Sequence, residues 1–357
     1  MIHDIEERLE NMGLSKSPFL NYDAHNPDFS KVFVDRTKEL YKINLALEYY
    51  KSQSNRNLAF VGPSRIGKTT LLQYTIMQVQ DQFRCLYFEY PVRFNEFCQK
   101  CLDFFGNGIS HEPLPHDSHD LGNLLITRSG LSAGNTVIII DNFEDMLSIP
   151  SDEVDGFIRL FRRAKCLFIL ACTEREWSEI QTRFPKMKYA FAEELYIPPF
   201  SVKNCVEFFE SRISLARMKA SSGLLPFTEE SIKVIGIYSF FIPGRMNDLA
   251  NKVLFEALTE DIRIIQPDFI RGLILSSPVQ GPYLAGLTDK EIQALESMIE
   301  QNRPISFEDL AELLGVSRVA AAGYFQKLLE RKVVFQMVSP GKKRIFHITD
   351  TFRNVLV

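Results

Sequence analysis

Two kinds of apolar pattern alternate along the first 200 residues. Unbroken apolar runs are separated by segments in which apolar residues recur every three or four positions, and these segments predict helices. An unbroken run such as Val137–Ile140 suits a strand that is buried on both faces. Strands that alternate with helices predict a parallel sheet covered on both sides, the α/β class. The predicted strands cover residues 57–61, 84–89, 136–140, 166–172 and 194–197.

Helical patterns dominate the regions outside this sheet. The N-terminus predicts an amphipathic helix to Met12, a loop over 14–31 and a helix over 33–50 with Thr37 as its cap. After Ser201 the strand pattern stops, and a second, helical region begins. Its helices are predicted at 202–219, 228–239, 244–258 and 266–274, before a linker at 276–282.

The last segment has the plan of a winged helix. Helices are predicted at 289–301, 306–314 and 317–330, with Ser306 and Ser317 as caps. Two strands, 333–338 and 344–348, follow and flank a basic turn. Helix, helix, turn, helix and hairpin is the order of elements in winged-helix modules.

Composition narrows the class of protein. The chain has 357 residues and a net charge of −4, yet the stretch from Gly315 to Val357 holds eight basic and two acidic residues. A basic end on an acidic chain favours an anionic partner. Scattered cysteines indicate a reducing compartment, and no apolar run approaches the ~18 residues of a membrane span. We expect a cytoplasmic or nucleoid-associated protein without membrane contact.

A phosphate-binding loop is the clearest chemical motif. The residues Gly62, Pro63, Ser64, Arg65, Ile66, Gly67, Lys68 and Thr69 fit G-x-x-x-x-G-K-[ST] between a strand and a helix that starts at Thr70. In such a loop the backbone N–H groups cradle phosphates, the lysine reaches the β- and γ-phosphates, and the threonine hydroxyl ligates Mg²⁺. The sequence therefore predicts ATP or ADP bound with Mg²⁺.

A carboxylate at the end of a central strand completes the predicted magnesium site. Asp141 follows four apolar residues, so it emerges at the carboxyl edge of the sheet beside the phosphate loop. The sequence leaves two alternatives for the group that activates the attacking water. Glu144 is one candidate for this base, and the alternative is that Asn142 only orients water and hydrolysis is slow.

Polar residues farther along suggest nucleotide sensing. Thr173 closes the strand 166–172, where a hydroxyl can sense the γ-phosphate. Arg175 or Arg183 could stabilise charge on a transferring phosphoryl group, in trans from a neighbouring subunit. Arg245 opens a helix in the second region and would reach the γ-phosphate when that region closes.

The winged helix supplies a candidate DNA interface. We expect the third helix of this module to expose Ala321 among the residues that approach a DNA groove. We expect the turn between the two strands to contact DNA phosphates. Protein contact through the same module is the alternative. The candidate DNA-binding residues are Arg318, Gln326, Lys342, Lys343 and Arg344.

These motifs in this order resemble AAA+ ATPases of the origin-recognition type, with relatives in the STAND and archaeal ATPase groups. The resemblance spans residues from about 30 to 357 and implies an AAA+ sheet domain, a helical lid and a winged helix. It implies that Gly62–Thr69 form the Walker A motif and that Asp141 ends the Walker B motif. It also implies that Thr173 is the sensor 1 residue, Arg245 the sensor 2 residue and Arg183 the arginine finger. It also implies that Arg36 lies near the adenine.

Two positions depart from the family pattern. Residues Phe33–Leu40 resemble the family motif F-x-G-R-x-x-E-L, but Asp35 replaces its usual glycine. Asn142 replaces the usual catalytic glutamate. The second departure favours a nucleotide-gated switch over a motor. The predicted domains are an N-terminal extension over 1–31, the nucleotide-binding domain over 32–200, the lid over 201–283 and the winged helix over 284–357.

The leading hypothesis is an AAA+ switch with slow ATP hydrolysis that binds double-stranded DNA and assembles with like or unlike ATPase subunits. Replication, loading or transposition-type roles fit this hypothesis. A STAND-like signalling or defence regulator, whose winged helix contacts protein, is the alternative. A nucleotide-locked structural subunit of a larger complex is a third, and it predicts ADP that survives purification.

Overall fold

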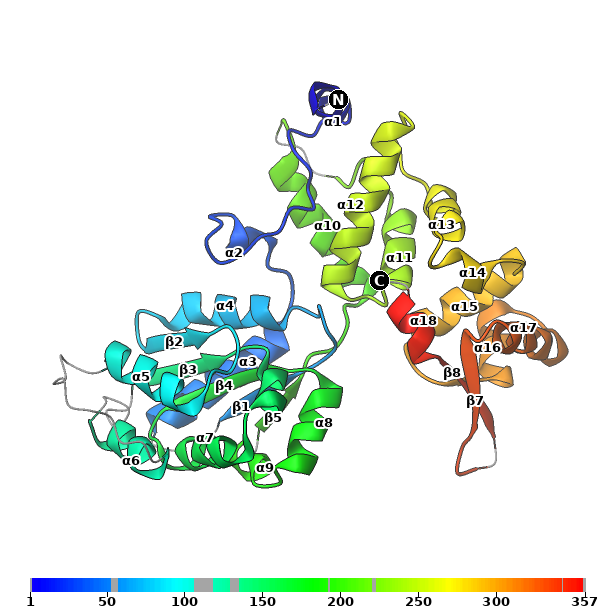
Figure 1. Ribbon diagram of the computed structural model, residues 1–357. Coiled ribbons are helices and arrows are strands. Elements are labelled where there is room, and N and C mark those ends of the chain that lie inside the picture. Colours follow the sequence, from blue (N-terminus) through cyan, green and yellow to red (C-terminus); the bar gives the residue numbers. More distant parts are fainter. Residues whose placement is uncertain are drawn as a thin grey trace. The chain divides into compact units, whose positions relative to one another are not determined.

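A computed structural model describes residues 2–52, 57–105, 118–128, 135–191, 193–219, 223–341 and 343–355. The chain forms two compact units. The sheet unit comprises residues 23–30 and 35–198, and the helical unit comprises residues 1–22, 31–34 and 199–357. Both are coloured by sequence in Figure 1.

The sheet unit is built on five described parallel strands in the order β2-β3-β4-β1-β5. The strands are β1 (Leu58–Val61), β2 (Arg84–Phe88), β3 (Thr136–Ile140), β4 (Leu167–Cys172) and β5 (Glu193–Tyr196). Its helical segments are α3 (Thr37–Lys51), α4 (Lys68–Val79), α5 (Phe94–Phe105), α6 (Ser118–Arg128), η2 (Phe143–Ser148), α7 (Ser151–Arg163), α8 (Glu174–Arg183) and α9 (Met187–Ala190). The predicted parallel α/β architecture is confirmed.

Alternation along the strands explains why both faces of the sheet are covered. Ile138 and Ile140 of β3 belong to a buried cluster with Phe157 and Phe161 of α7. Ile139 points to the opposite face, because successive side chains of a strand alternate, and it too is fully buried. Figure 1 shows α4 and α7 on opposite sides of the sheet.

The N-terminal predictions need two corrections. Helix α3 begins at Thr37, so this residue is the first helical position and Arg36 takes the cap position instead. The predicted loop over 14–31 also contains the start of a short helix, α2 (Phe29–Val32). Phe29 and Val32 are 1 % and 5 % exposed, so burial of two apolar side chains anchors this turn.

The helical unit contains α1 (Ile2–Asn11), α10 (Val202–Ala216), α11 (Glu229–Tyr238), α12 (Pro243–Thr259), α13 (Pro267–Ser276) and α14 (Gly281–Leu284). The Arg8 guanidinium of α1 donates to the Thr259 carbonyl at the end of α12, at 3.1 Å. A cation suits this place because the last carbonyls of a helix lack partners within it. The N-terminal helix therefore packs on its own chain.

The C-terminal part of the helical unit is a winged helix. It contains α15 (Asp289–Gln301), β6 (Ile305–Ser306), α16 (Phe307–Leu314), α17 (Arg318–Glu330), β7 (Val334–Val338), β8 (Arg344–Ile348) and α18 (Asp350–Val355). Its described sheet has the order β6-β8-β7 and is antiparallel. Ser306 caps α16 in a capping box with Asp309, as predicted. Strand β6 and helix α18 were not predicted, since each is too short to show a period.

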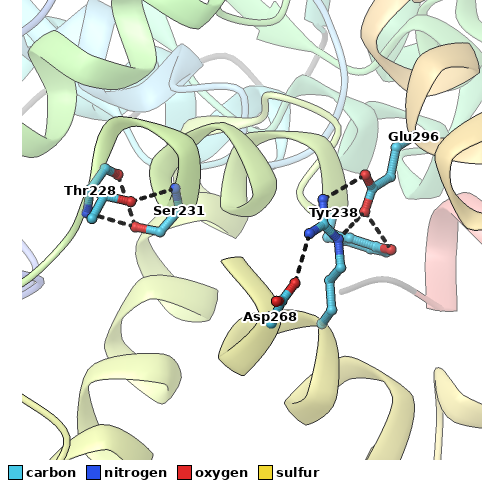
Figure 2. Close-up of polar contacts among 6 residues, drawn as sticks. Thr228, Ser231, Tyr238, Asp268 and Glu296 are labelled. Carbon is cyan, nitrogen blue, oxygen red and sulfur yellow. Dashed lines mark hydrogen bonds and ion pairs between the residues drawn. The ribbon is translucent and has the colours of Figure 1, made fainter. Parts of the chain in front are cut away.

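A buried ionic network joins the winged helix to the preceding helices, as Figure 2 shows. Arg271 of α13 grips Glu296 of α15 with Nε–Oε1 at 2.8 Å and Nη2–Oε2 at 2.9 Å. The hydroxyl of Tyr238 on α11 donates to the same carboxylate at 3.1 Å. Glu296 is 7 % exposed. A bidentate pair of this kind fixes the relative orientation of its two side chains, so α11 and α13 orient α15 and, with it, the winged helix.

No helix in the part of the chain that the structure describes is both long and apolar enough to cross a bilayer.

Candidate nucleotide site and winged-helix face

The phosphate loop joins β1 to α4 in an open curl. Arg65 and Gly67 both have left-handed backbone angles, with φ of 66° and 97°. Gly62 is constrained by space, because a Cβ there would meet the Ile197 carbonyl oxygen at 3.1 Å. Glycine at position 67 avoids the cost of a left-handed side chain, and glycine at position 62 allows the close approach of two backbones.

Lys68 is buried and turned onto its own loop. Its Nζ donates to the carbonyl oxygens of Gly62 and Pro63, each at 3.0 Å. Burial lowers the pKa of Lys68, while the negative charges of Glu144 and Asp141 oppose this shift. The ammonium group is thus held at the loop by two carbonyl oxygens, which phosphate oxygens could replace as its hydrogen-bond acceptors.

Asp141 is the centre of a tight hydrogen-bond cluster. Its Oδ2 accepts from the Thr69 hydroxyl at 2.5 Å and from the Tyr87 hydroxyl at 2.9 Å. Its Oδ1 accepts from the backbone N–H of Asn142 at 2.9 Å. The side chain is 1 % exposed. The two predicted magnesium ligands, Thr69 and Asp141, therefore lie in direct contact.

The sequence patterns did not predict that Tyr87 belongs to this site. Tyr87 lies on β2 and pairs in register with Ile139, two positions before Asp141. Burial raises the pKa of Tyr87, and the charge of Asp141 raises it further, so the phenol stays a neutral donor. A tyrosine near the carboxyl end of a predicted strand was the only sequence feature that pointed to this contact. The contact itself depends on the order of the strands, which places β2 beside β3.

Asn142 has a conformational role that the sequence did not reveal. Its φ is 44°, a left-handed angle that asparagine tolerates better than most residues. Its side-chain amide donates to the Glu89 carbonyl oxygen at 2.9 Å. The side chain at the position of the usual catalytic glutamate is thus engaged with the backbone that follows β2.

Two groups near the loop keep polar atoms buried without a hydrogen bond among the described residues. They are Oε2 of Glu144 and Oγ1 of Thr173. The negative charge of Glu144 also raises the pKa of Lys68 more than the charge of any other group does. Buried polar atoms usually find partners, so two such atoms beside the loop fit a site that is completed by phosphate and water.

Arg36 does not point to open solvent. It is 4 % exposed, and its guanidinium donates to the carbonyl oxygens of Pro198 at 2.8 Å and Ile66 at 3.1 Å. Burial lowers the pKa of Arg36, while the charges of Glu39 and Asp35 oppose the shift. Arg36 therefore contacts the phosphate loop itself, and a contact with adenine stays a prediction.

The other predicted arginines lie in two places. Arg183 is exposed at the end of α8 and donates to the Leu147 carbonyl oxygen at 2.9 Å. Arg245 lies in the first turn of α12, and its Nη1 donates to the Arg353 carbonyl oxygen of α18 at 2.8 Å. Their proposed actions on a phosphoryl group stay predictions.

The candidate DNA-binding residues share a face that also carries an acid. Arg318 Nη2 lies 2.9 Å from Oε1 of Glu308, and Lys343 Nζ lies 3.5 Å from its Oε2. These pairs are exposed, and such pairs contribute about 0–1 kcal/mol, so phosphates can compete for both cations. Arg344 and Gln326 are exposed as well, whereas Lys342 lies outside the described residues.

One expectation for this face is wrong. Ala321 is fully buried, because helix α17 turns it into the core with Phe325 and Leu328. The exposed side of the helix carries Val319 and Gly323 instead.

The sheet unit and its phosphate loop define an ATPase domain of the AAA class. Residues 51–180 match the family model described as an AAA domain. With this match, the motif Gly62–Thr69 and the contact between Thr69 and Asp141, the chain is an ATPase that binds ATP or ADP with Mg²⁺. In that site the loop N–H groups and Lys68 would hold phosphates, and Thr69 and Asp141 would hold the metal. Bound Mg²⁺ would supply charge neutralisation for the phosphates.

Solved structures extend the likeness beyond this domain. ORC2 of Aeropyrum pernix, in its ADPNP–ADP complexes, aligns with a TM-score of 0.56 at 15% identity, over 95% of this chain and 96% of its own. The ADP form of the same protein aligns with a TM-score of 0.54 at 16% identity, over 95% and 97%. A single-site variant of RuvB of Thermotoga maritima gives 0.50 at 16% identity, over 91% and 95%.

The likeness to ORC2 covers 95% of this chain, so the chain shares the fold of ORC2, with an AAA domain followed by a winged helix. No curated protein is similar enough in sequence to count as a match.

Proposed function

We propose that this protein is an ATP-binding switch that hydrolyses ATP slowly and binds double-stranded DNA through its winged helix. The observation that carries the proposal is the combination of a complete phosphate loop with an exposed basic hairpin in one chain. ORC2 and RuvB, which share the fold, support a DNA-related role. Assembly with like or unlike ATPase subunits belongs to the same proposal.

The residues after Asp141 support the proposal of slow hydrolysis. Asn142 carries no carboxylate, and its amide is engaged with the Glu89 carbonyl. Glu144, with one buried oxygen that accepts no hydrogen bond among the described residues, is the group we propose to polarise water. We expect turnover below the typical enzyme range of roughly 1–10³ s⁻¹, and a further decrease in Glu144→Gln.

Coupling between nucleotide and DNA is proposed to pass through the helical unit. The grip of Arg271 on Glu296 makes the lid helices and the winged helix move together. A lid that closes on nucleotide through Arg245 would therefore carry the DNA-binding face with it. Release of Arg245 from the Arg353 carbonyl would accompany this closure.

The test is duplex DNA binding, followed by fluorescence anisotropy with ATP, with ADP and without nucleotide. We expect the wild-type dissociation constant to depend on the nucleotide and Lys68→Ala to lose that dependence. Lys165→Ala, at an exposed lysine of the same unit, is the matched control. Equal affinity in all three conditions for the wild type would refute the switch.

A second measurement addresses the DNA contacts. The double variant Arg318→Ala, Arg344→Ala removes two cations, so the slope of log affinity against log salt should fall by about two. Lys290→Ala on α15, also exposed, should leave the slope unchanged.

A protein-binding winged helix is the second candidate, as in a STAND-like signalling or defence regulator. The exposed apolar side chains on β7 favour it: Phe335, Met337 and Val338 are 41 %, 48 % and 62 % exposed. Under this candidate the protein would not bind duplex DNA, and the double variant would instead alter nucleotide exchange or assembly.

A further inference from the structure

Arg36 lies near the point where the chain enters the sheet unit for the last time. The last two passages of the chain between the units are at Val34–Asp35 and at Pro198–Pro199. Arg36 follows the first passage by two residues, and its Nη1 donates to the carbonyl of Pro198, the residue before the second passage, at 2.8 Å. The Arg36 side chain thus links the two ends of the sheet-unit segment 35–198.

The same guanidinium holds the phosphate loop. Its Nη2 donates to the carbonyl oxygen of Ile66 at 3.1 Å. Ile66 lies between the two left-handed residues of the loop, Arg65 and Gly67. The Ile66 carbonyl and the Gly67 N–H belong to one planar peptide group, so a rotation of this peptide on phosphate binding would move the carbonyl that Arg36 holds.

The backbone around Arg36 is unusual in its own right. Asp35 and Arg36 have φ of 58° and 78°, although neither is glycine. Two successive left-handed residues persist only where the surrounding contacts hold them, and such sites concentrate at functional positions. Asp35, which stands where the family pattern has glycine, is one of the residue types that tolerate this angle.

We infer that Arg36 is a positioning residue that transmits the conformation of the phosphate loop to the junction with the lid. The inference rests on the proposed nucleotide switch and names the route by which it leaves the sheet unit. A shift of the Ile66 carbonyl weakens or redirects one donor of a buried, rigid fork, and the other donor holds the Pro198 carbonyl. Nucleotide state and junction geometry are coupled through this fork.

Hydrogen exchange read by mass spectrometry tests the coupling. Exchange is measured with and without saturating ATP, in peptides covering the loop at 62–70 and the junctions at 31–38 and 195–202. In the wild type we expect ATP to slow exchange about tenfold or more in the loop and in both junction peptides. Arg36→Lys keeps the charge but replaces the two donor nitrogens, Nη1 and Nη2, with a single nitrogen, so the rigid planar fork that joins the Pro198 and Ile66 carbonyls is lost.

The expected result for Arg36→Lys is slowed exchange in the loop, showing that ATP is bound, with a response below about twofold at the junctions. Arg162→Met, at an exposed arginine of α7, should behave like the wild type. An undiminished junction response in Arg36→Lys overturns the inference and leaves the switch intact. A wild type whose junctions ignore ATP, although its loop is protected, rejects the switch and this inference together.

A structural role alone would give a different pattern. Arg36→Met removes the charge as well as both donors, so it tests whether the protein still folds. If Arg36→Lys and Arg36→Met melt at lower temperature but keep the full junction response to ATP, Arg36 only stabilises the fold and the inference is wrong.

Discussion

Removing one hydroxyl, in Tyr87→Phe, should weaken magnesium-dependent nucleotide binding without disturbing the fold. The Tyr87 hydroxyl donates to Oδ2 of Asp141 at 2.9 Å, and the ring keeps its place when the oxygen is removed. Asp141 would retain its contacts with Thr69 and with the Asn142 N–H. The carboxylate would then be free to rotate away from the orientation that suits a metal.

The magnitude follows from the contacts. A hydrogen bond to a charged group contributes about 1.5–3 kcal/mol. Tyr87 is half-buried, so water can replace part of the lost bond, and the lower value of about 1.5 kcal/mol is appropriate. This energy corresponds to about a tenfold change in an equilibrium constant. Partners behind a metal ligand typically change metal affinity by 10–100-fold.

The assay is the affinity for a fluorescent ADP analogue with and without Mg²⁺. The ratio of the two dissociation constants reports how much the metal tightens binding. We expect this ratio to fall about tenfold in Tyr87→Phe, while affinity without Mg²⁺ stays within about twofold. Tyr90→Phe is the matched control, because Tyr90 follows the same strand and is 53 % exposed.

Two results would contradict this role of Tyr87. An unchanged ratio in Tyr87→Phe would mean that Asp141 is oriented by its other two partners alone. Equal weakening with and without Mg²⁺ would mean that the variant distorts the phosphate loop rather than the metal site.

Three further predictions concern other parts of the molecule. Arg271→Met leaves the carboxylate of Glu296 buried without its cation, so the free energy of unfolding in urea should fall by about 3 kcal/mol. Thr173→Val replaces a buried hydroxyl that makes no hydrogen bond among the described residues, so melting temperature should rise while single-turnover ATP hydrolysis slows about tenfold or more. The Ser306 cap lowers the pKa of Asp309, so its contribution to stability is complete above about pH 4 and is lost as pH falls below it. Thermal melts between pH 3 and 7 should show a weaker acid dependence in Ser306→Ala.

Local sequence patterns predicted most helices and strands, but they predicted the first residues of the helices less accurately. The helix at 289–301 and the capping box at Ser306 follow from spacing within a few residues, and the structure confirms both. Thr37 was predicted as a cap by its type alone. The left-handed backbone at Arg36, which a buried guanidinium holds in place, moved the cap by one position.

The recognition helix shows the limit of spacing arguments. Residue types at 318–326 fit an exposed face, but the rotation of α17 about its axis is decided by packing of Phe325 and Leu328 into the core. That rotation buries Ala321 and exposes Val319. If the exposed face of a helix is misplaced by one residue, a buried position is taken for an exposed one.

The amino-acid sequence was sufficient to predict the phosphate loop, the strand before Asp141 and the order of the modules, because these depend on residue types at short, fixed spacing. Tertiary structure alone decided that Tyr87 binds Asp141, that Arg36 binds Pro198 and that Arg271 binds Glu296. These partners are 54, 162 and 25 positions apart. Their meeting depends on strand order, register and helix packing, which place distant side chains within hydrogen-bond reach and which no local pattern encodes.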